Sequence, residues 1–349
     1  MMMCKKSPLL VLFLVVSLCA SLSFMHLLGE ERDAVLCDQC GGALGAEYYE
    51  AADRSFCSEE CFKHFFVCAR CGKFSEEIES HANIVGEDIF FCPECAKKER
   101  CFFCDGFDNL ERVEDDRILC ETCRKEGVAS EEDAAAILDE VRQSLFERFQ
   151  FPKEHEIPLE ITTFARISEA TPHDDGLAPL ATHVTQSPVN VHLGNDGKIV
   201  LTPLPIECKI QILSHSPRDL LMDSLAHELA HDFVRRRFFA IDDLKIEEGF
   251  AEFVAAQCNI LWKREALNIR KDYNEHPIYG DGYRLFRDTY ASEGWEGVLA
   301  LLEEHSVSQE VFFMSKPPSE YVDSWTCFLL KLIGKTPTLK WEPNEKECH

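Results

Sequence analysis

Basic residues are scarce in this sequence. Its 349 residues include 36 Lys and Arg against 62 Asp and Glu, which gives a formal net charge of −26. A chain this acidic repels phosphate backbones and acidic membrane surfaces, so we expect no nucleic-acid partner. The one local basic run is Arg235 to Arg237. It lies on a predicted helix, and we interpret it as a solvated helix face.

A long apolar run is confined to the N-terminus. Lys5 and Lys6 precede an apolar stretch from Leu9, and small residues follow near Ala20. This pattern predicts that residues 1–28 are a secretory signal peptide. Read through to Leu28, the stretch reaches about the 20 residues that span a bilayer, so a signal anchor is the alternative. Both predict export, periplasmic or extracellular, with membrane contact through this segment alone.

Cysteine is concentrated between residues 37 and 123, where 12 of the 18 cysteines form close pairs. Two pairs make up each of three modules, and 16, 20 and 15 residues separate the pairs within them. Close pairs at this separation are typical of a tetrahedral Cys4 zinc shell. The predicted structural zinc ligands are Cys37, Cys40, Cys57 and Cys61; Cys68, Cys71, Cys92 and Cys95; and Cys101, Cys104, Cys120 and Cys123.

A disulfide framework is the alternative for these cysteines, because export would place them in an oxidising compartment. A disulfide scaffold does not need to repeat Cys-x2-Cys, whereas a zinc knuckle does, so zinc is favoured. Each module is too small for a hydrophobic core, and bound metal would supply much of its folding free energy. Modules of this kind usually bind protein partners.

A second domain is predicted over residues 130–310, followed by a tail at 311–349. Ser130 can cap an amphipathic helix with an acidic first turn. A small sheet is expected next, and Ser216 and Pro217 are expected to open another helix. The domain is therefore α+β. The predicted strands are 159–167, 189–193, 198–202 and 207–214.

The segment "LAHELAHDF" at 225–233 places His227 and His231 four residues apart, on one face of a helix. Glu248 follows His231 by 17 positions on a second predicted helix. Two histidines and a distant glutamate form a His2Glu zinc site with an open fourth position. Glu228 would act there as general base towards water and then protonate the leaving amine.

Two further glutamates belong to this prediction. Glu247 is the rival third ligand, but Glu248 is preferred because it precedes Gly249, whose missing side chain lets the two helices approach near the metal. Glu252 lies one turn after Glu248, where it can hydrogen-bond a ligand histidine. The expected zinc content is one catalytic and three structural ions.

Three segments in order, "SLAHELAHDF", "KIEEGFAEFVA" and "YGDGYR", resemble the plant LIM-domain zinc metallopeptidases, which act as ubiquitin receptors and limit organ growth. The likeness extends over roughly residues 101–305 and includes the third cysteine module. It implies a zincin-like, gluzincin-type peptidase domain preceded by LIM-like modules. His227, His231 and Glu248 match the family's zinc ligands, and Glu228 matches its catalytic glutamate. Tyr279 and Asp281 match a shared turn motif, in which Tyr279 either stabilises an oxyanion or is a turn residue packed under Gly280 and Gly282.

The sequence also departs from that family. No ubiquitin-interacting segment is visible, so activation by ubiquitin does not carry over. Six residues separate Cys61 from Cys68 and five separate Cys95 from Cys101, which is longer than LIM spacing and predicts independent knuckles. Glu252 stands where the plant proteins have glutamine.

The leading hypothesis is a zinc-dependent endopeptidase that cleaves selected protein or peptide substrates, with its zinc modules recruiting them. The alternative is an adaptor whose zinc fingers bind proteins while the HELAH site is inactive or structural. A third hypothesis is a secreted, disulfide-stapled protein that carries the same peptidase domain.

Overall fold

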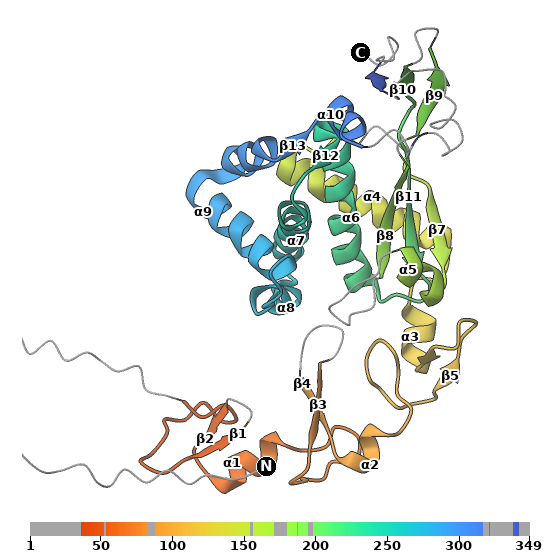
Figure 1. Cartoon of the computed structure of the whole chain (residues 1–349). Helices are drawn as coiled ribbons and strands as arrows, with labels where there is room; N and C mark the ends of the chain where they lie inside the picture. The colour runs from red at the N-terminus through yellow and green to blue at the C-terminus, as the bar shows by residue number, and fades with distance from the viewer. Residues whose placement is uncertain are drawn as a thin grey trace, which may run out of the picture. The chain divides into compact units, whose positions relative to one another are not determined.

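The computed structural model describes residues 36–51, 54–82, 88–153, 156–170, 180–186, 188–194, 198–316, 321 and 338–341. The predicted signal segment and most of the predicted C-terminal tail lie outside these residues. The described chain forms two compact units, the first up to Glu99 and the second from Arg100 onward. None of the described helices is long and apolar enough to cross a membrane. The architecture is mixed α+β (Figure 1).

The first unit contains two cysteine modules with the same order of parts: a knuckle, a hairpin and a short helix. Aromatic side chains join them, because Phe62 and Phe66 of the first module contact Phe74 and Phe90 of the second. The prediction of independent knuckles is therefore wrong for this pair, which shares one core. The elements are β1 (Tyr49–Ala51), β2 (Arg54–Phe56), α1 (Glu59–Phe65), β3 (Glu79–Ala82), β4 (Asp88–Phe91) and α2 (Pro93–Ala96).

The third cysteine module repeats this plan within the second unit, as β5 (Glu111–Arg112), β6 (Ile118–Leu119) and α3 (Glu121–Glu126). Its buried Phe103 and Leu119 share a core with Ile167 and Leu213 of the following domain. The third module is therefore packed onto the α+β domain and does not form a separate unit.

Two three-stranded sheets follow, with orders β7-β11-β8 and β14-β10-β9. The predicted single sheet is thus split, because segments 189–193 and 198–202 pair with each other away from 207–214. The predicted strand 159–167 ends at Thr162, and α5 (Phe164–Ala170) takes up the rest. The strands are β7 (Leu159–Thr162), β8 (Ala181–Gln186), β9 (Val189–Leu193), β10 (Ile199–Pro203), β11 (Glu207–Leu213) and β14 (Leu339–Trp341).

Helices build the rest of the second unit around one large apolar core. Ser130 caps the first of them, as predicted, by accepting a hydrogen bond from the Asp133 amide. The longest helix is kinked at Gly294, where φ is +69°. The remaining elements are α4 (Glu131–Phe149), α6 (Arg218–Phe238), β12 (Ala240–Ile241), α7 (Leu244–Leu261), a 3-10 turn (Glu265–Asn268), α8 (Ile269–Asp272), α9 (Tyr279–Glu304), β13 (Ser306–Val307) and α10 (Gln309–Met314).

Helices α6 and α7 pack together and carry the HELAH segment and the predicted glutamate ligands. On the other side of α6 lies β8, an edge strand of the first sheet (Figure 1). α6 begins at Arg218, one residue later than expected: Pro217 takes the N-cap position predicted for Ser216, and Ser216 does not cap the helix. The Ser216 hydroxyl instead donates to the carbonyl oxygen of Leu213. α7 is capped by Asp243, whose carboxylate accepts from the amide of Lys245.

Candidate metal centres

His227 and His231 project from the same face of α6, one turn apart. Their Nε2 atoms lie 3.1 Å from each other. Leu225 and Leu229 bury the helix in the core. The two imidazoles are thereby held side by side on a fixed helix, with a small part of each ring still exposed.

Glu248 of α7 completes this group. Its Oε2 atom lies 3.3 Å from His227 Nε2 and 3.7 Å from His231 Nε2. Ligands about 2.1 Å from a tetrahedral zinc ion are separated by about 3.4 Å, so these three atoms stand at the spacing that zinc requires. The donor set, two imidazole nitrogens and one carboxylate oxygen, is also one that zinc accepts.

The local charge favours a cation at this point. Burial opposes protonation of both imidazoles, but Glu248 and neighbouring carboxylates outweigh it, so the pKa of His227 is raised and that of His231 is raised well above its usual value. Burial likewise opposes ionisation of Glu248, yet the two histidines hold its pKa well below the usual range. The same electrostatic field that favours protons here would favour a metal ion.

Each histidine has a carboxylate behind it. His227 Nδ1 lies 3.6 Å from Glu252 Oε1, and His231 Nδ1 lies 3.5 Å from Glu247 Oε1. The structure therefore puts Glu252 where the sequence analysis expects it. Glu247, the rival third ligand, lies behind His231 and does not face the point where the Nε2 atoms meet. A carboxylate at Nδ1 fixes the tautomer that leaves Nε2 free to bind a metal.

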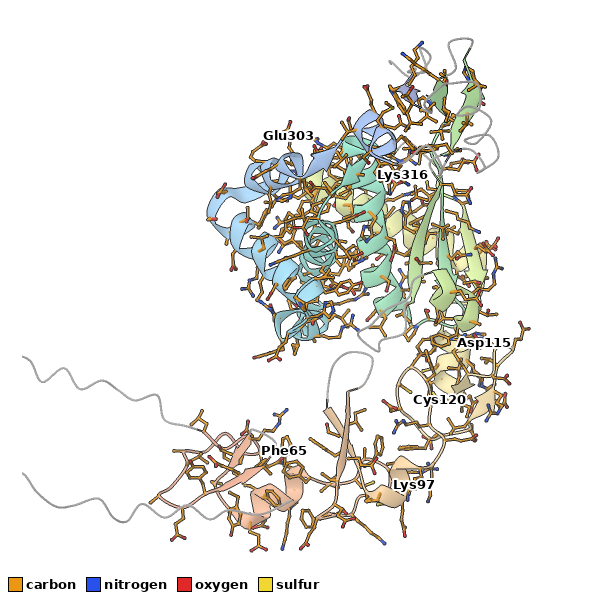
Figure 2. The ribbon with its side chains drawn as sticks, in the orientation of Figure 1. Phe65, Lys97, Asp115, Cys120, Glu303 and Lys316 are labelled. Atoms are coloured by element: carbon orange, nitrogen blue, oxygen red, sulfur yellow. The ribbon has the colours of Figure 1, made fainter. Side chains whose placement is uncertain are left out.

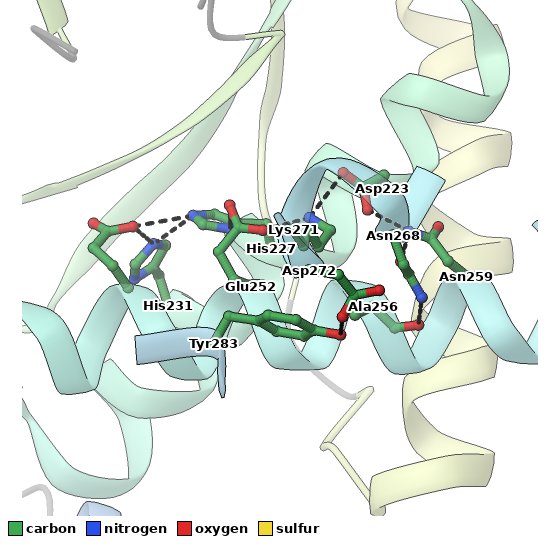
Figure 3. A network of polar contacts seen from close by, with 11 residues as sticks. Asp223, His227, His231, Glu252, Ala256, Asn259, Asn268, Lys271, Asp272 and Tyr283 are labelled. Carbon is green, nitrogen blue, oxygen red and sulfur yellow. Dashed lines mark hydrogen bonds and ion pairs between the residues drawn. The ribbon is translucent and has the colours of Figure 1, made fainter. Parts of the chain in front are cut away.

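Glu252 is held in turn by Lys271 of α8, a residue that the sequence analysis missed (Figure 3). Lys271 is buried, and its ammonium also lies 3.3 Å from Asp223 Oδ2. Asp223 accepts a 2.6 Å hydrogen bond from Asn259. Burial raises the pKa of Glu252, but Lys271 and His227 outweigh it and lower the pKa to about 2. The ion pair thus keeps Glu252 ionised beside His227.

Glu228 is almost fully buried and points towards the sheet. Its Oε2 atom accepts a 2.7 Å hydrogen bond from the backbone N–H of His183 in β8. This contact fixes the carboxylate between the HELAH helix and an edge strand. Strand β8 was not predicted, because no apolar alternation marks "ATHVTQ".

Tyr279 is the first residue of α9, and its ring centroid lies 5.2 Å from that of His276. Its proposed role towards an oxyanion stays a prediction. The basic run Arg235 to Arg237 lies at the exposed end of α6, as expected, where Arg235 and Arg237 stack on phenylalanine rings.

The twelve module cysteines gather into three Cys4 clusters, with the memberships predicted from sequence. Sulfur atoms lie 3.6 Å apart between Cys40 and Cys57, and also between Cys104 and Cys120. A disulfide would bring them to about 2.05 Å, whereas thiolates on one tetrahedral zinc ion lie about 3.8 Å apart. The three clusters therefore have the arrangement of structural zinc sites, and Figure 2 shows Cys120 in the third.

Backbone amide groups lower the pKa of one cysteine in each of the first two clusters. Burial raises the pKa of Cys37 and of Cys68, but amide groups of the surrounding knuckles outweigh it and lower each pKa to about 6. The lowered pKa favours the thiolate form of Cys37 and of Cys68. Thiolates are the form of cysteine that binds zinc.

Compared with known proteins, the chain matches no protein-family model, no curated protein and no solved structure.

Proposed function

We propose that the second unit is a zinc-dependent endopeptidase with a zincin-like, gluzincin-type site. The observation that carries the proposal is the convergence of His227 Nε2, His231 Nε2 and Glu248 Oε2 within 3.7 Å of one another. Glu228 directly follows His227 on α6, the helix that carries both histidines. The likeness of the three sequence segments to the plant LIM-domain peptidases supports the same assignment.

His227, His231 and Glu248 would hold the zinc ion. Bound there, zinc would supply Lewis-acid chemistry, polarising a peptide carbonyl and making water more acidic. Glu252 and Glu247 orient the two imidazoles through their Nδ1 atoms. The protein thus fixes all three ligands before substrate arrives.

Glu228 moves the proton in this scheme. Its Oε2 is held by the amide of His183, so its other oxygen, Oε1, is the atom that takes a proton from water and delivers it to the leaving amine. Strand β8 is an edge strand, and beyond His183, whose amide is taken by Glu228, it could bind an extended substrate by adding it as a further strand. The substrate class is therefore an extended protein segment.

The cysteine modules would serve this activity by binding protein partners. The first two share an aromatic core and form a compact unit of their own, which suits a recruiting module. This feature also favours the second candidate function, an adaptor with an inactive HELAH site. We propose export or N-terminal anchoring from the apolar segment at 1–28, with no nucleic-acid partner.

Cleavage of a proteome-derived peptide library, followed by mass spectrometry, tests the assignment. Glu228→Gln should abolish cleavage and leave the zinc content unchanged, because glutamine keeps the shape but cannot take the proton. His227→Ala should lose both one zinc ion and activity. Full cleavage by the Glu228→Gln protein would overturn the mechanism. If the wild-type protein and the Glu228→Gln variant both cleave no peptide, the adaptor function is tested by capturing protein partners with each of them.

A further inference from the structure

A second group of metal-binding side chains lies beside the HELAH helix, at the join between the first sheet and α6. His183 of β8, Cys208 of β11 and Asp232 of α6 bring one ligand atom each within 4.8 Å of the others. The side chains of His183 and Asp232 are each only 5% exposed. Three elements far apart in sequence thus meet at one buried polar point.

The imidazole of His183 is oriented for this point. Its Nδ1 lies 3.0 Å from the hydroxyl of Thr185, whereas its buried Nε2 has no hydrogen-bond partner among the described residues. The nearest carboxylate oxygen, Asp232 Oδ1, is 3.6 Å from Nε2. When Nδ1–H donates to Thr185, the lone pair of Nε2 faces an anionic oxygen. A cation between the two atoms would stabilise that arrangement. When the Thr185 hydroxyl donates to Nδ1 instead, Nε2–H stands 3.6 Å from Asp232 Oδ1, too far for a hydrogen bond, so neither tautomer joins the two side chains directly.

The distances match those of a shared zinc ion. Around tetrahedral zinc, a nitrogen and an oxygen ligand lie about 3.4 Å apart, and a sulfur and an oxygen ligand about 3.6 Å apart. Here His183 Nε2 to Asp232 Oδ1 is 3.6 Å, and Cys208 Sγ to Asp232 Oδ1 is 3.7 Å. The mixture of nitrogen, sulfur and oxygen donors favours zinc over calcium or magnesium, which take oxygen ligands.

We propose that His183, Cys208 and Asp232 form a fifth zinc site, which fastens β8 and β11 to α6. Arg236 at present supplies positive charge there, because its Nε lies 3.0 Å from each oxygen of Asp232 and its Nη2 lies 3.4 Å from Cys208 Sγ. The arginine side chain is 36% exposed and can turn into solvent. Zinc would replace it, with the fourth position open to water.

This site would act on the structure of its surroundings and not on the peptidase chemistry. The amide of His183 holds Glu228, so zinc on the His183 side chain would fix the strand that positions that carboxylate. The proposal stands whether or not the HELAH site is an active peptidase.

Zinc per chain, measured by elemental analysis on the full chain after dialysis, tests the site. Cys208→Ala and Asp232→Asn should each remove one zinc ion. To exclude an indirect effect on the HELAH site, Cys208→Ala is also made in a His227→Ala background, where it should still remove one ion. Cys258→Ala, at a buried cysteine of α7 outside the group, is the matched control and should leave the count unchanged. Circular dichroism verifies that each variant is folded.

Arg236→Gln provides the opposite change. Removing the competing positive charge should slow the loss of this one zinc ion to a chelator. An unchanged zinc count in both Cys208→Ala and Asp232→Asn, with one ion lost from His227→Ala, would overturn the proposal and leave the Arg236–Asp232 ion pair as the only role of this group. A zinc ion lost equally fast from wild type, Arg236→Gln and Cys208→Ala would be adventitious and would also overturn it.

Discussion

Gly249 of α7 lies directly against Gly282 of α9. A Cβ atom on Gly249 would stand 2.4 Å from the carbonyl carbon of Gly282, and one on Gly282 would stand 2.5 Å from the carbonyl oxygen of Lys245. The two backbones are in contact at the residue that follows Glu248. Any side chain there would push α7 away from α9 and shift the glutamate with it.

Gly249→Ala should therefore lower the free energy of unfolding by about 1–3 kcal/mol, the usual cost of overpacking a buried contact. Urea denaturation would measure it. Glu296→Ala, at an exposed position of α9, is the control and should change stability by less than about 0.5 kcal/mol. If Gly249→Ala had the same unfolding midpoint as the control, the prediction would be wrong, because α7 and α9 could then move apart without loss of stability.

The role of Gly249 shows where reasoning from sequence reached its limit. The spacing of His227 and His231 predicted that these two side chains meet, because positions on one helix face follow from local periodicity. Glu248, on the second helix, was predicted from the ligand pattern of a His2Glu zinc site. The same reasoning expected Gly249 to admit α6, but the glycine faces α9. Nothing in a helix's own sequence states which neighbour its glycine will meet.

The residues that were missed are all nonlocal. Lys271 lies 19 positions after Glu252, in a four-residue helix without a recognisable pattern. Strand β8 lacks alternation because α6 buries one end of it and the rest is half-exposed. The cysteine memberships, by contrast, were predicted completely, since ligand pairs of a zinc knuckle lie close in sequence.

Lys271→Met should weaken zinc binding at the HELAH site by about 10–100-fold, because Glu252 would lose the charge that holds it behind His227. Stability should also fall by about 3–5 kcal/mol, since a buried carboxylate is left beside a carboxylate, Asp223. Competition with a chelator measures the affinity.

Lys263→Met makes the same side-chain change at an exposed site and is the control for Lys271→Met. The double variant Lys271→Met/Glu252→Gln should recover much of the lost stability, because the unpaired charge is gone, but should not recover zinc affinity. Recovery of both would show that Lys271 acts only by neutralising charge and does not position Glu252.

The third cysteine module is joined to the sheet by a buried ion pair. The Nε–H of Arg117 is shared between both carboxylate oxygens of Asp115, and Nη2 of Arg117 donates to the carbonyl oxygen of Ser214. Asp115 also accepts from the Phe164 amide. Arg117→Met should cost about 3–5 kcal/mol because Asp115 stays buried without its partner. Asp115→Asn in the same chain should lessen that cost. Additive losses in a double-mutant cycle would contradict the pairing.

Glu160 makes the stability of the sheet depend on pH in the acid range. On the sheet, Glu160 of β7 accepts hydrogen bonds from Lys209 and Gln211 of β11, at 2.6 and 3.1 Å. The hydrogen bond from Lys209 has the largest effect and that from Gln211 the next largest, and together they lower the pKa of Glu160 to about 2. The unfolded chain has a glutamate pKa of about 4.3, so the native state holds the proton less tightly. The stabilisation is therefore complete above about pH 4.3 and is lost as pH falls towards 2.

Glu160→Gln should consequently reduce stability at pH 7 by about 1 kcal/mol, as expected for a partly exposed pair. The difference between wild type and variant should shrink between pH 4.3 and 2, because both then carry a neutral side chain. Urea unfolding at pH 7, 5 and 3 would follow it. Glu169→Gln, on α5, is the control, and its effect should not change in the same way. The prediction would be wrong if the difference in free energy of unfolding between wild type and Glu160→Gln stayed constant down to pH 3. The shape of the side chain, and not its charge, would then stabilise the fold.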